Sequence, residues 1–115
     1  MEEIPWTIET FETSRIDKPV DEFIKKQQPP AKAKIAHIIK LLKQYGNRLG
    51  LPHSKTLGFG LCELRIRGKE EIRILYCFAS SRTIYLLHGF KKQTQQTPQK
   101  ELRIASERMR SLTTI

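Results

Sequence analysis

The sequence predicts an α+β domain in which helices and an antiparallel sheet share one core. Four short runs alternate apolar and polar residues, which is typical of half-buried strands. Three other runs repeat apolar residues every three or four positions, which is typical of amphipathic helices. At 115 residues the chain is large enough for one modest core and not for two, so residues 1–115 are expected to form a single domain.

The N-terminal half supplies one strand and two helices. The stretch WTIETF, residues 6–11, alternates in the manner of a strand. KPVDEFIKKQQ, residues 18–28, predicts a helix with an apolar face made of Val20, Phe23 and Ile24. PPAKAKIAHIIKLLKQYGN, residues 29–47, gives the strongest helix signal, with an apolar stripe made of Ile35, Ile38, Ile39, Leu42 and Tyr45.

Two alternating runs on either side of Gly68 predict a β-hairpin, and its register follows from matching the apolar faces. A loop of residues 68–70 pairs Ile66 with Ile72 and sets the apolar face of one strand beside that of the other. A two-residue turn would mix the faces, because a slip of one residue inverts every side chain. The three-residue loop is therefore expected.

The same register places Arg65 directly opposite Arg73, on the sheet face that the helices leave open. Like charges that face each other across a sheet are unfavourable. The pair is tolerable where both side chains extend into open solvent, in the direction of Glu63, and useful where an anion lies between them. The register also puts Cys62 and Cys77 on opposite faces, so no disulfide is expected between them.

A third strand and a final helix complete the pattern. TIYLLHGF, residues 83–90, is the strand. TPQKELRIASERMRSL, residues 97–112, predicts the helix, with Thr97 as its N-cap and Pro98 in its first turn. Its apolar stripe is made of Leu102, Ala105, Met109 and Leu112. The predicted order is β-α-α-β-β-β-α, with the helices packed on one face of the sheet.

Composition excludes several classes of protein. No apolar run approaches the length of a membrane span, and the N-terminal MEEIPW lacks the basic and apolar regions of a signal peptide. Two cysteines without close spacing indicate neither a disulfide framework nor a zinc site. A cytoplasmic protein is expected.

The charge is unevenly distributed. The net charge is +9, yet residues 1–22 hold seven acids against two bases, so the remainder carries +14. A basic body of this size favours a polyanionic partner, nucleic acid before membrane. The alternative is ordinary solubilising charge, and only the placement of the cations can decide between the two.

Several motifs occur together between residue 55 and the final helix. KTLGFGLCELRIRGKEEIRILY is followed by IYLLHGFKKQTQQTP and a closing helix. This combination resembles the RelE/ParE superfamily of bacterial toxins, and within it the HigB-like branch of phage-derived proteins. The positions that carry the resemblance are Lys55, Leu57, Gly60, Leu61, Glu63, Leu64, Arg65, Arg73, Tyr76, residues 86–90, Lys92, Thr94, Thr97 and Pro98.

The resemblance implies the toxin of a type II toxin–antitoxin system. Its partner would be an antitoxin, a small helix-turn-helix protein with which it forms a higher-order complex. Its activity would be that of an endoribonuclease that cleaves mRNA on the ribosome, without metal or cofactor, and so inhibits translation and growth. A minority branch poisons DNA gyrase, so a non-catalytic toxin that binds a protein target is one alternative. An RNA-binding module without catalysis is another.

Metal-free RNA cleavage needs an activated 2′-hydroxyl, stabilised charge on the phosphorane and a proton for the leaving 5′-oxygen. Arginine suits the second task, because it binds two phosphate oxygens at once and stays charged. The candidate catalytic residues are Arg65, Arg73, Lys92 and His88. The candidate RNA-binding residues are Lys55, Arg67, Lys91 and Phe90.

Proton transfer has two candidates. His88 titrates near neutral pH and ends a strand. Its alternation groups it with Ile84 and Leu86 on the core-facing side, so a buried structural histidine is the alternative. If His88 is structural, Lys92 is the next candidate. For Phe90 the alternative to base stacking is a core aromatic, and for the lysines it is ordinary surface charge.

Overall fold

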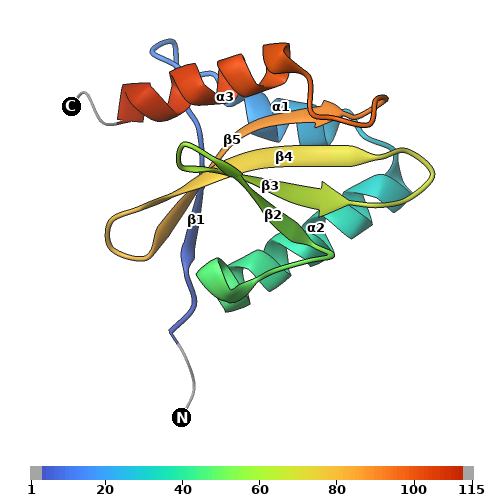
Figure 1. The fold of residues 1–115 in the computed structure, drawn as a ribbon, viewed down its shortest axis with the longest axis horizontal. Coiled ribbons are helices and arrows are strands. Elements are labelled where there is room, and N and C mark those ends of the chain that lie inside the picture. The colour runs from blue at the N-terminus through green and yellow to red at the C-terminus, as the bar shows by residue number, and fades with distance from the viewer. Residues whose placement is uncertain (1–3, 113–115) are drawn as a thin grey trace.

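Five strands form one sheet in the spatial order β1-β5-β4-β3-β2 (Figure 1). The computed structural model describes residues 4–112. Its strands are β1 (Thr7–Thr10), β2 (Ser54–Gly58), β3 (Leu61–Ile66), β4 (Ile72–Ala79) and β5 (Thr83–Lys91). Its helices are α1 (Pro19–Lys25), α2 (Pro29–Tyr45) and α3 (Gln99–Leu112), with a short 3-10 helix η1 (Gly46–Arg48) after α2. Over this part of the chain no helix has the length and apolar character of a membrane span.

The predicted α+β class and the register of the central hairpin are confirmed. Strands β3 and β4 pair antiparallel, apolar residues face apolar residues, and Arg65 lies opposite Arg73. Cys62 and Cys77 are buried, free and in separate apolar clusters on opposite faces of the sheet. Matching the apolar faces was therefore sufficient to fix the pairing.

Two features of the sheet differ from the prediction. Strand β1 pairs with β5 in parallel, so the sheet is mixed and not antiparallel throughout. Parallel neighbours need a long crossover connection, and here the chain between them passes through α1, α2 and the three middle strands. The additional strand, β2, pairs antiparallel with β3. Its five residues, SKTLG, include one large apolar side chain, so no apolar–polar alternation marks them as a strand.

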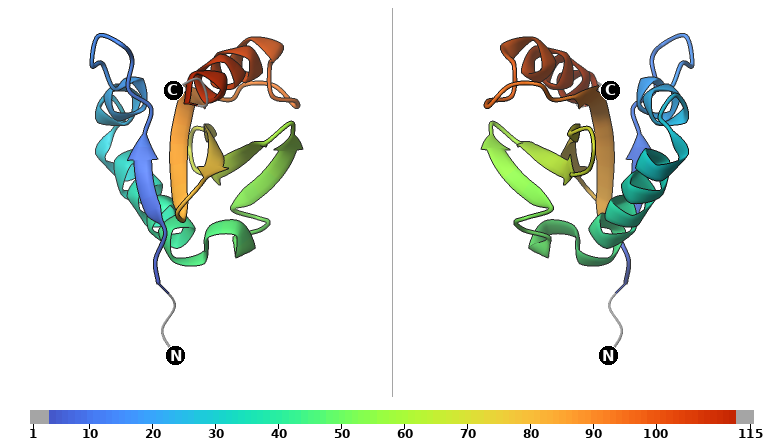
Figure 2. Two further views of the ribbon diagram at one scale, coloured as in Figure 1. Left: turned by 90° about the vertical axis from the view of Figure 1, so that its left-hand side faces the viewer. Right: turned by 90° about the vertical axis from the view of Figure 1, so that its right-hand side faces the viewer.

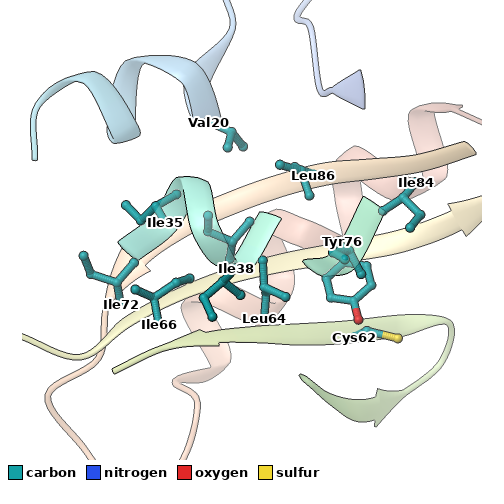
Figure 3. Close-up of a cluster of buried hydrophobic side chains, with 12 residues drawn as sticks. Val20, Ile35, Ile38, Cys62, Leu64, Ile66, Ile72, Tyr76, Ile84 and Leu86 are labelled. Carbon is teal, nitrogen blue, oxygen red and sulfur yellow. The ribbon is translucent and has the colours of Figure 1, made fainter. Parts of the chain in front are cut away.

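Both faces of the sheet are covered, which corrects the expectation that all helices pack on one side. Helices α1 and α2 cover one face, over a cluster that includes Ile35 and Leu64 (Figure 3). Helix α3 covers the other face, over a cluster that includes Leu75 and Ala105 (Figures 1 and 2). The reason lies in β4, which is buried without alternation over residues 72–77, so its second apolar row needs a cover of its own.

A bulge in β5 changes the direction of His88. Leu75 lies opposite His88 and Tyr76 lies opposite Leu86, so Leu87 is an extra residue in β5. Such a residue shifts every later side chain to the other face. His88 therefore points to the α3 side with Leu75, and the grouping of His88 with Leu86 by simple alternation is wrong.

Candidate functional site

The face of the sheet beneath α3 carries a cluster of charged side chains at the end where β3 leads into β4. Paired residues share a face, so Arg65 on β3, Arg73 on β4 and Phe90 on β5 form one row. Glu63 precedes Arg65 by two residues and lies on the same face, opposite Leu75. Burial differs sharply along this cluster: Glu63 is 1% exposed, Arg73 4% and Arg65 16%.

Glu63 joins the two arginines. Its Oε1 accepts a hydrogen bond from Nε of Arg65 at 3.2 Å and lies 3.6 Å from Nε of Arg73. Its Oε2 accepts a hydrogen bond from the Thr97 hydroxyl at 2.5 Å. The sequence left two explanations for the facing arginines, open solvent or an anion between them. A buried anion does lie between them, and it is the protein's own carboxylate.

Arg73 belongs largely to the interior. Its Nη1 donates to the backbone carbonyl of Ile72 at 3.1 Å, and its Nη2 donates to Oε1 of Glu71 at 3.4 Å. Its Nε is buried without a hydrogen-bond partner in the described chain, although the Glu63 carboxylate is near. The expectation that both arginines point away from the helices is wrong, because α3 covers this face.

Arg65 is the more accessible of the two arginines. Its Nε is hydrogen-bonded to Glu63, and within residues 4–112 its two terminal amino groups make no hydrogen bond. A guanidinium fixed at Nε and open at its terminal nitrogens presents donors in a set direction, which suits an oxyanion. Arg65 can therefore bind a phosphate, while Glu63 holds it in place.

His88 is engaged at both ring nitrogens. Its Nε2 lies 2.7 Å from Oε1 of Glu101, and Nη1 of Arg108 lies 3.4 Å from its Nδ1. Because Arg108 can only donate, Nδ1 is the acceptor and Nε2–H donates to Glu101. Arg108 also donates to the backbone carbonyl of Leu87 at 2.8 Å. The cluster ties β5 to α3.

Burial sets the protonation of His88. It lowers the pKa of His88 below its ordinary value, while the hydrogen bond to Glu101 acts in the opposite direction. The ring stacks against Phe90 with centroids 5.6 Å apart and planes inclined by 22°. Phe90 itself is buried, so it packs with the core and has no face open for a base.

The segment after β5 carries the lysines expected to bind RNA. Lys91 pairs with Glu70 at 2.8 Å, so part of its charge is compensated. Lys92 is half-buried, and its backbone N–H donates to the carbonyl of Glu71 at 2.8 Å. Glu71 also binds Arg73, which places Lys92 at the same end of the sheet as the arginine pair. Residues 93–96 form an exposed loop that leads to α3.

The two remaining candidates lie on different sides of β3. Lys55 on β2 is exposed and lies opposite Glu63, so it shares the α3-side face with Arg65. Arg67 borders a cleft of about 420 Å³ between α2 and β3, whose lining is mainly apolar. Lys34, His37 and His53 also line this cleft, and so does Arg65. The structure thus gathers Arg65, Arg73, His88, Phe90 and Lys55 on the α3 side. Lys91 lies opposite Ile72, on the face that α1 and α2 cover, and Arg67 borders the cleft.

Sequence reasoning named Glu63 only as a group near the two arginines, and it missed the roles of Thr97, Glu101 and Arg108 in holding the cluster together. Glu63 left a signal, because a carboxylate two residues before Arg65 on a strand shares its face. Thr97 was expected to cap the final helix, but that helix begins at Gln99 and the Thr97 hydroxyl donates to Glu63 instead. Glu101 and Arg108 left no signal, because the face that α3 covers was assigned wrongly.

The mixed sheet with three helices is compatible with the RelE-like fold of toxins from toxin–antitoxin systems. Residues 22–110 match the family described as "Phage derived protein Gp49-like (DUF891)", and the chain belongs to this Gp49-like family. The family is part of the RelE-related toxin–antitoxin group, so the resemblance is confirmed at that level. None of the curated proteins matches the chain.

Proposed function

We propose that the protein is the toxin of a type II toxin–antitoxin pair, of the HigB-like kind, and that it cleaves mRNA on the ribosome. The observation that carries the proposal is Arg65, held at Nε by buried Glu63 and open at its terminal nitrogens. Membership of the Gp49-like family supports the toxin assignment and a neighbouring antitoxin as partner. The excess of +14 outside residues 1–22 supports RNA as the ligand.

In this proposal the arginines stabilise charge. Arg65 donates from its terminal nitrogens to a non-bridging oxygen of the scissile phosphate, where negative charge increases as the 2′-oxygen attacks. Arg73 lies directly across the hairpin and adds a second fixed positive charge, which needs no rearrangement during the reaction. Fixed cations thus do the work that a metal ion does in other nucleases, and no cofactor is needed.

Proton transfer falls to Lys92 in this scheme. It follows β5 at the same end of the sheet as Arg65 and Arg73, and its ammonium can deliver a proton to the 5′-oxygen as the bond from phosphorus to that oxygen breaks. Solvent water takes the proton of the 2′-hydroxyl as its oxygen bonds to phosphorus. His88 is assigned a positioning role, because Glu101 and Arg108 occupy its ring nitrogens. Lys55, Lys91 and Arg67 are assigned to contacts with the phosphates of the RNA backbone. Phe90, which is buried beside Arg73 in the sheet, is assigned a packing role.

The test compares matched arginine variants during induced expression in bacteria. Arg65→Ala should abolish growth arrest and mRNA cleavage while leaving the fold intact, because Arg65 is partly exposed. Arg15→Ala is the control, since Arg15 is exposed in the loop between β1 and α1. Cleavage sites are mapped by sequencing RNA 5′ ends in both strains. Growth arrest and cleavage by Arg65→Ala at the wild-type level would refute the proposal.

A second candidate function is a non-catalytic toxin that binds a protein such as DNA gyrase. The observation in its favour is the cleft between α2 and β3, which is apolar inside and carries Lys34 and Arg67 at its rim. Such a cleft suits an amphipathic acidic segment of a protein partner. Growth arrest without any new RNA 5′ ends would favour this candidate. Substitution of Lys34, which lines the cleft and lies on α2 away from the arginine pair, would then relieve the arrest.

A further inference from the structure

The tip of the β2–β3 hairpin carries an aromatic side chain that the fold does not use. Gly58 pairs with Leu61, so the loop consists of Phe59 and Gly60. Phe59 is 99% exposed, and its φ of 54° lies in the left-handed region. Gly58 and Gly60 on either side also have positive φ, at 97° and 87°.

Phenylalanine is an unfavourable choice at this position. Two-residue hairpin loops with two left-handed residues strongly prefer Asn, Asp or Gly at the first of them. A bulky side chain with positive φ is an outlier, because its Cβ crowds the backbone. The exposed ring also adds nothing to stability, since its apolar surface stays in water in the folded protein as in the unfolded chain. An exposed aromatic alone is ordinary, but one that occupies a strained backbone position points to a role outside folding.

The tip lies on the α3 side of the sheet, at the end away from the arginine pair. Lys55 shares that face with Arg65, and Leu57 packs against the apolar cluster under α3. A Cβ placed on Gly60 would lie 3.5 Å from the Met109 sulfur of α3, so the tip stands beside this helix (Figures 1 and 2). Along β2, Phe59 is about 13 Å from Lys55, at roughly 3.3 Å per residue.

We propose that Phe59 is a stacking platform for an unpaired base of the substrate RNA strand, an inference that rests on the proposed RNA cleavage. The strand would run from Arg65 past Lys55 to the hairpin tip, with its phosphates on the cations and one base on the ring. Stacking on an aromatic face needs no pocket and tolerates any base, which suits a convex tip. If Phe59 instead inserted into a pocket of a partner protein, the position of Lys55 between Arg65 and the hairpin tip would have no role.

The test uses a variant that separates stability from binding. Phe59→Asn places a residue that favours left-handed φ at the tip, so thermal stability should stay equal or rise. Affinity for a single-stranded 2′-O-methyl RNA, which has no free 2′-hydroxyl to attack, should fall about tenfold or more. Phe59→Trp should keep the wild-type affinity, because tryptophan also offers an aromatic face for stacking. Ser81→Asn is the control, because Ser81 also has positive φ, at 58°, in the turn between β4 and β5.

A base analogue gives a direct readout. RNA carrying 2-aminopurine should lose fluorescence on binding the wild-type protein and not on binding Phe59→Asn, because stacking quenches the analogue. Unchanged affinity and quenching in Phe59→Asn, with weakened binding in Arg65→Ala, would overturn the stacking role and leave the RNA-cleaving function standing. Unchanged RNA binding in both variants would overturn both. If Phe59→Asn no longer arrests growth but binds RNA with wild-type affinity, the stacking role is also overturned. The hairpin tip would then be a contact surface for a protein.

Discussion

Replacement of Glu63 by alanine is expected to be the most damaging single change at the cluster. Glu63 is the buried acceptor for Arg65 and Thr97 and lies 3.6 Å from Nε of Arg73. Its removal leaves two guanidiniums face to face, one of them buried, without the carboxylate between them. Removing one partner of a buried ion pair typically costs about 3–5 kcal/mol. A domain of this size has a total stability of about 5–15 kcal/mol, so the loss is a large share of it.

The assay is urea unfolding followed by circular dichroism, with thermal unfolding alongside. For a chain of 115 residues a loss of this size corresponds to a fall in Tm on the order of 10–20 °C. Glu107→Ala is the control: Glu107 is exposed on α3, and the change should stay within about 0.5 kcal/mol. The double variant Glu63→Leu with Arg73→Met should regain much of the loss, because an apolar pair replaces a buried ionic one.

A loss below about 1 kcal/mol for Glu63→Ala would refute this reasoning. It would mean that water or a side-chain shift readily neutralises the arginines, and that the Glu63 carboxylate does not organise the cluster. The same logic predicts that Arg73→Ala destabilises the fold more than Arg65→Ala, because Arg73 is the buried member of the pair and Glu63 keeps Arg73 and Thr97 as partners when Arg65 is removed.

Three further predictions concern other parts of the chain. Since the pKa of His88 is lowered on folding, the unfolded state takes up its proton first as the pH falls. The free energy of unfolding should therefore decrease as the pH drops through about 6.5, the ordinary pKa of histidine. Urea titrations at several pH values should show that His88→Gln loses this contribution to the pH dependence of stability. The double variant Lys91→Ala, Lys92→Ala should bind RNA with a weaker salt dependence. The slope of log affinity against log salt should become shallower by about 0.7 for each single-strand phosphate that the protein no longer binds. An unchanged slope would mean that the two lysines contact only solvent. Thiol labelling of the denatured, unreduced protein should find both Cys62 and Cys77 free, because they lie on opposite faces of the sheet; a native disulfide would contradict the register.

The strand pairings that could be predicted are those with clear alternation on both partners. Arg65 opposite Arg73 followed from matching the apolar faces of two neighbouring runs, and the structure has that pair. The pairing of β1 with β5 joins residues more than 70 positions apart. Local periodicity holds no information on such a partner, so the parallel pair could not be predicted.

The errors at the candidate site have one physical origin, the second face of the sheet. Leu75 and Cys77 make that face apolar, yet strict alternation groups them with Arg73 on the polar side of the strand. The bulge at Leu87 then hid the direction of His88, since a bulge depends on tertiary packing and breaks the period of two. The sequence therefore identified the charged residues of the candidate site, but it did not predict which of them are buried under α3.

The measurement that tests the proposed function most directly is primer extension on a defined mRNA in a purified translation system. We expect the wild-type protein to create new RNA 5′ ends only when ribosomes are translating, without added nuclease cofactors. Arg65→Ala, verified as folded by circular dichroism, should create none. Gyrase supercoiling activity measured in parallel should be unaffected by the wild-type protein. Equal cleavage by wild type and Arg65→Ala, or gyrase inhibition with intact mRNA, would contradict the proposal.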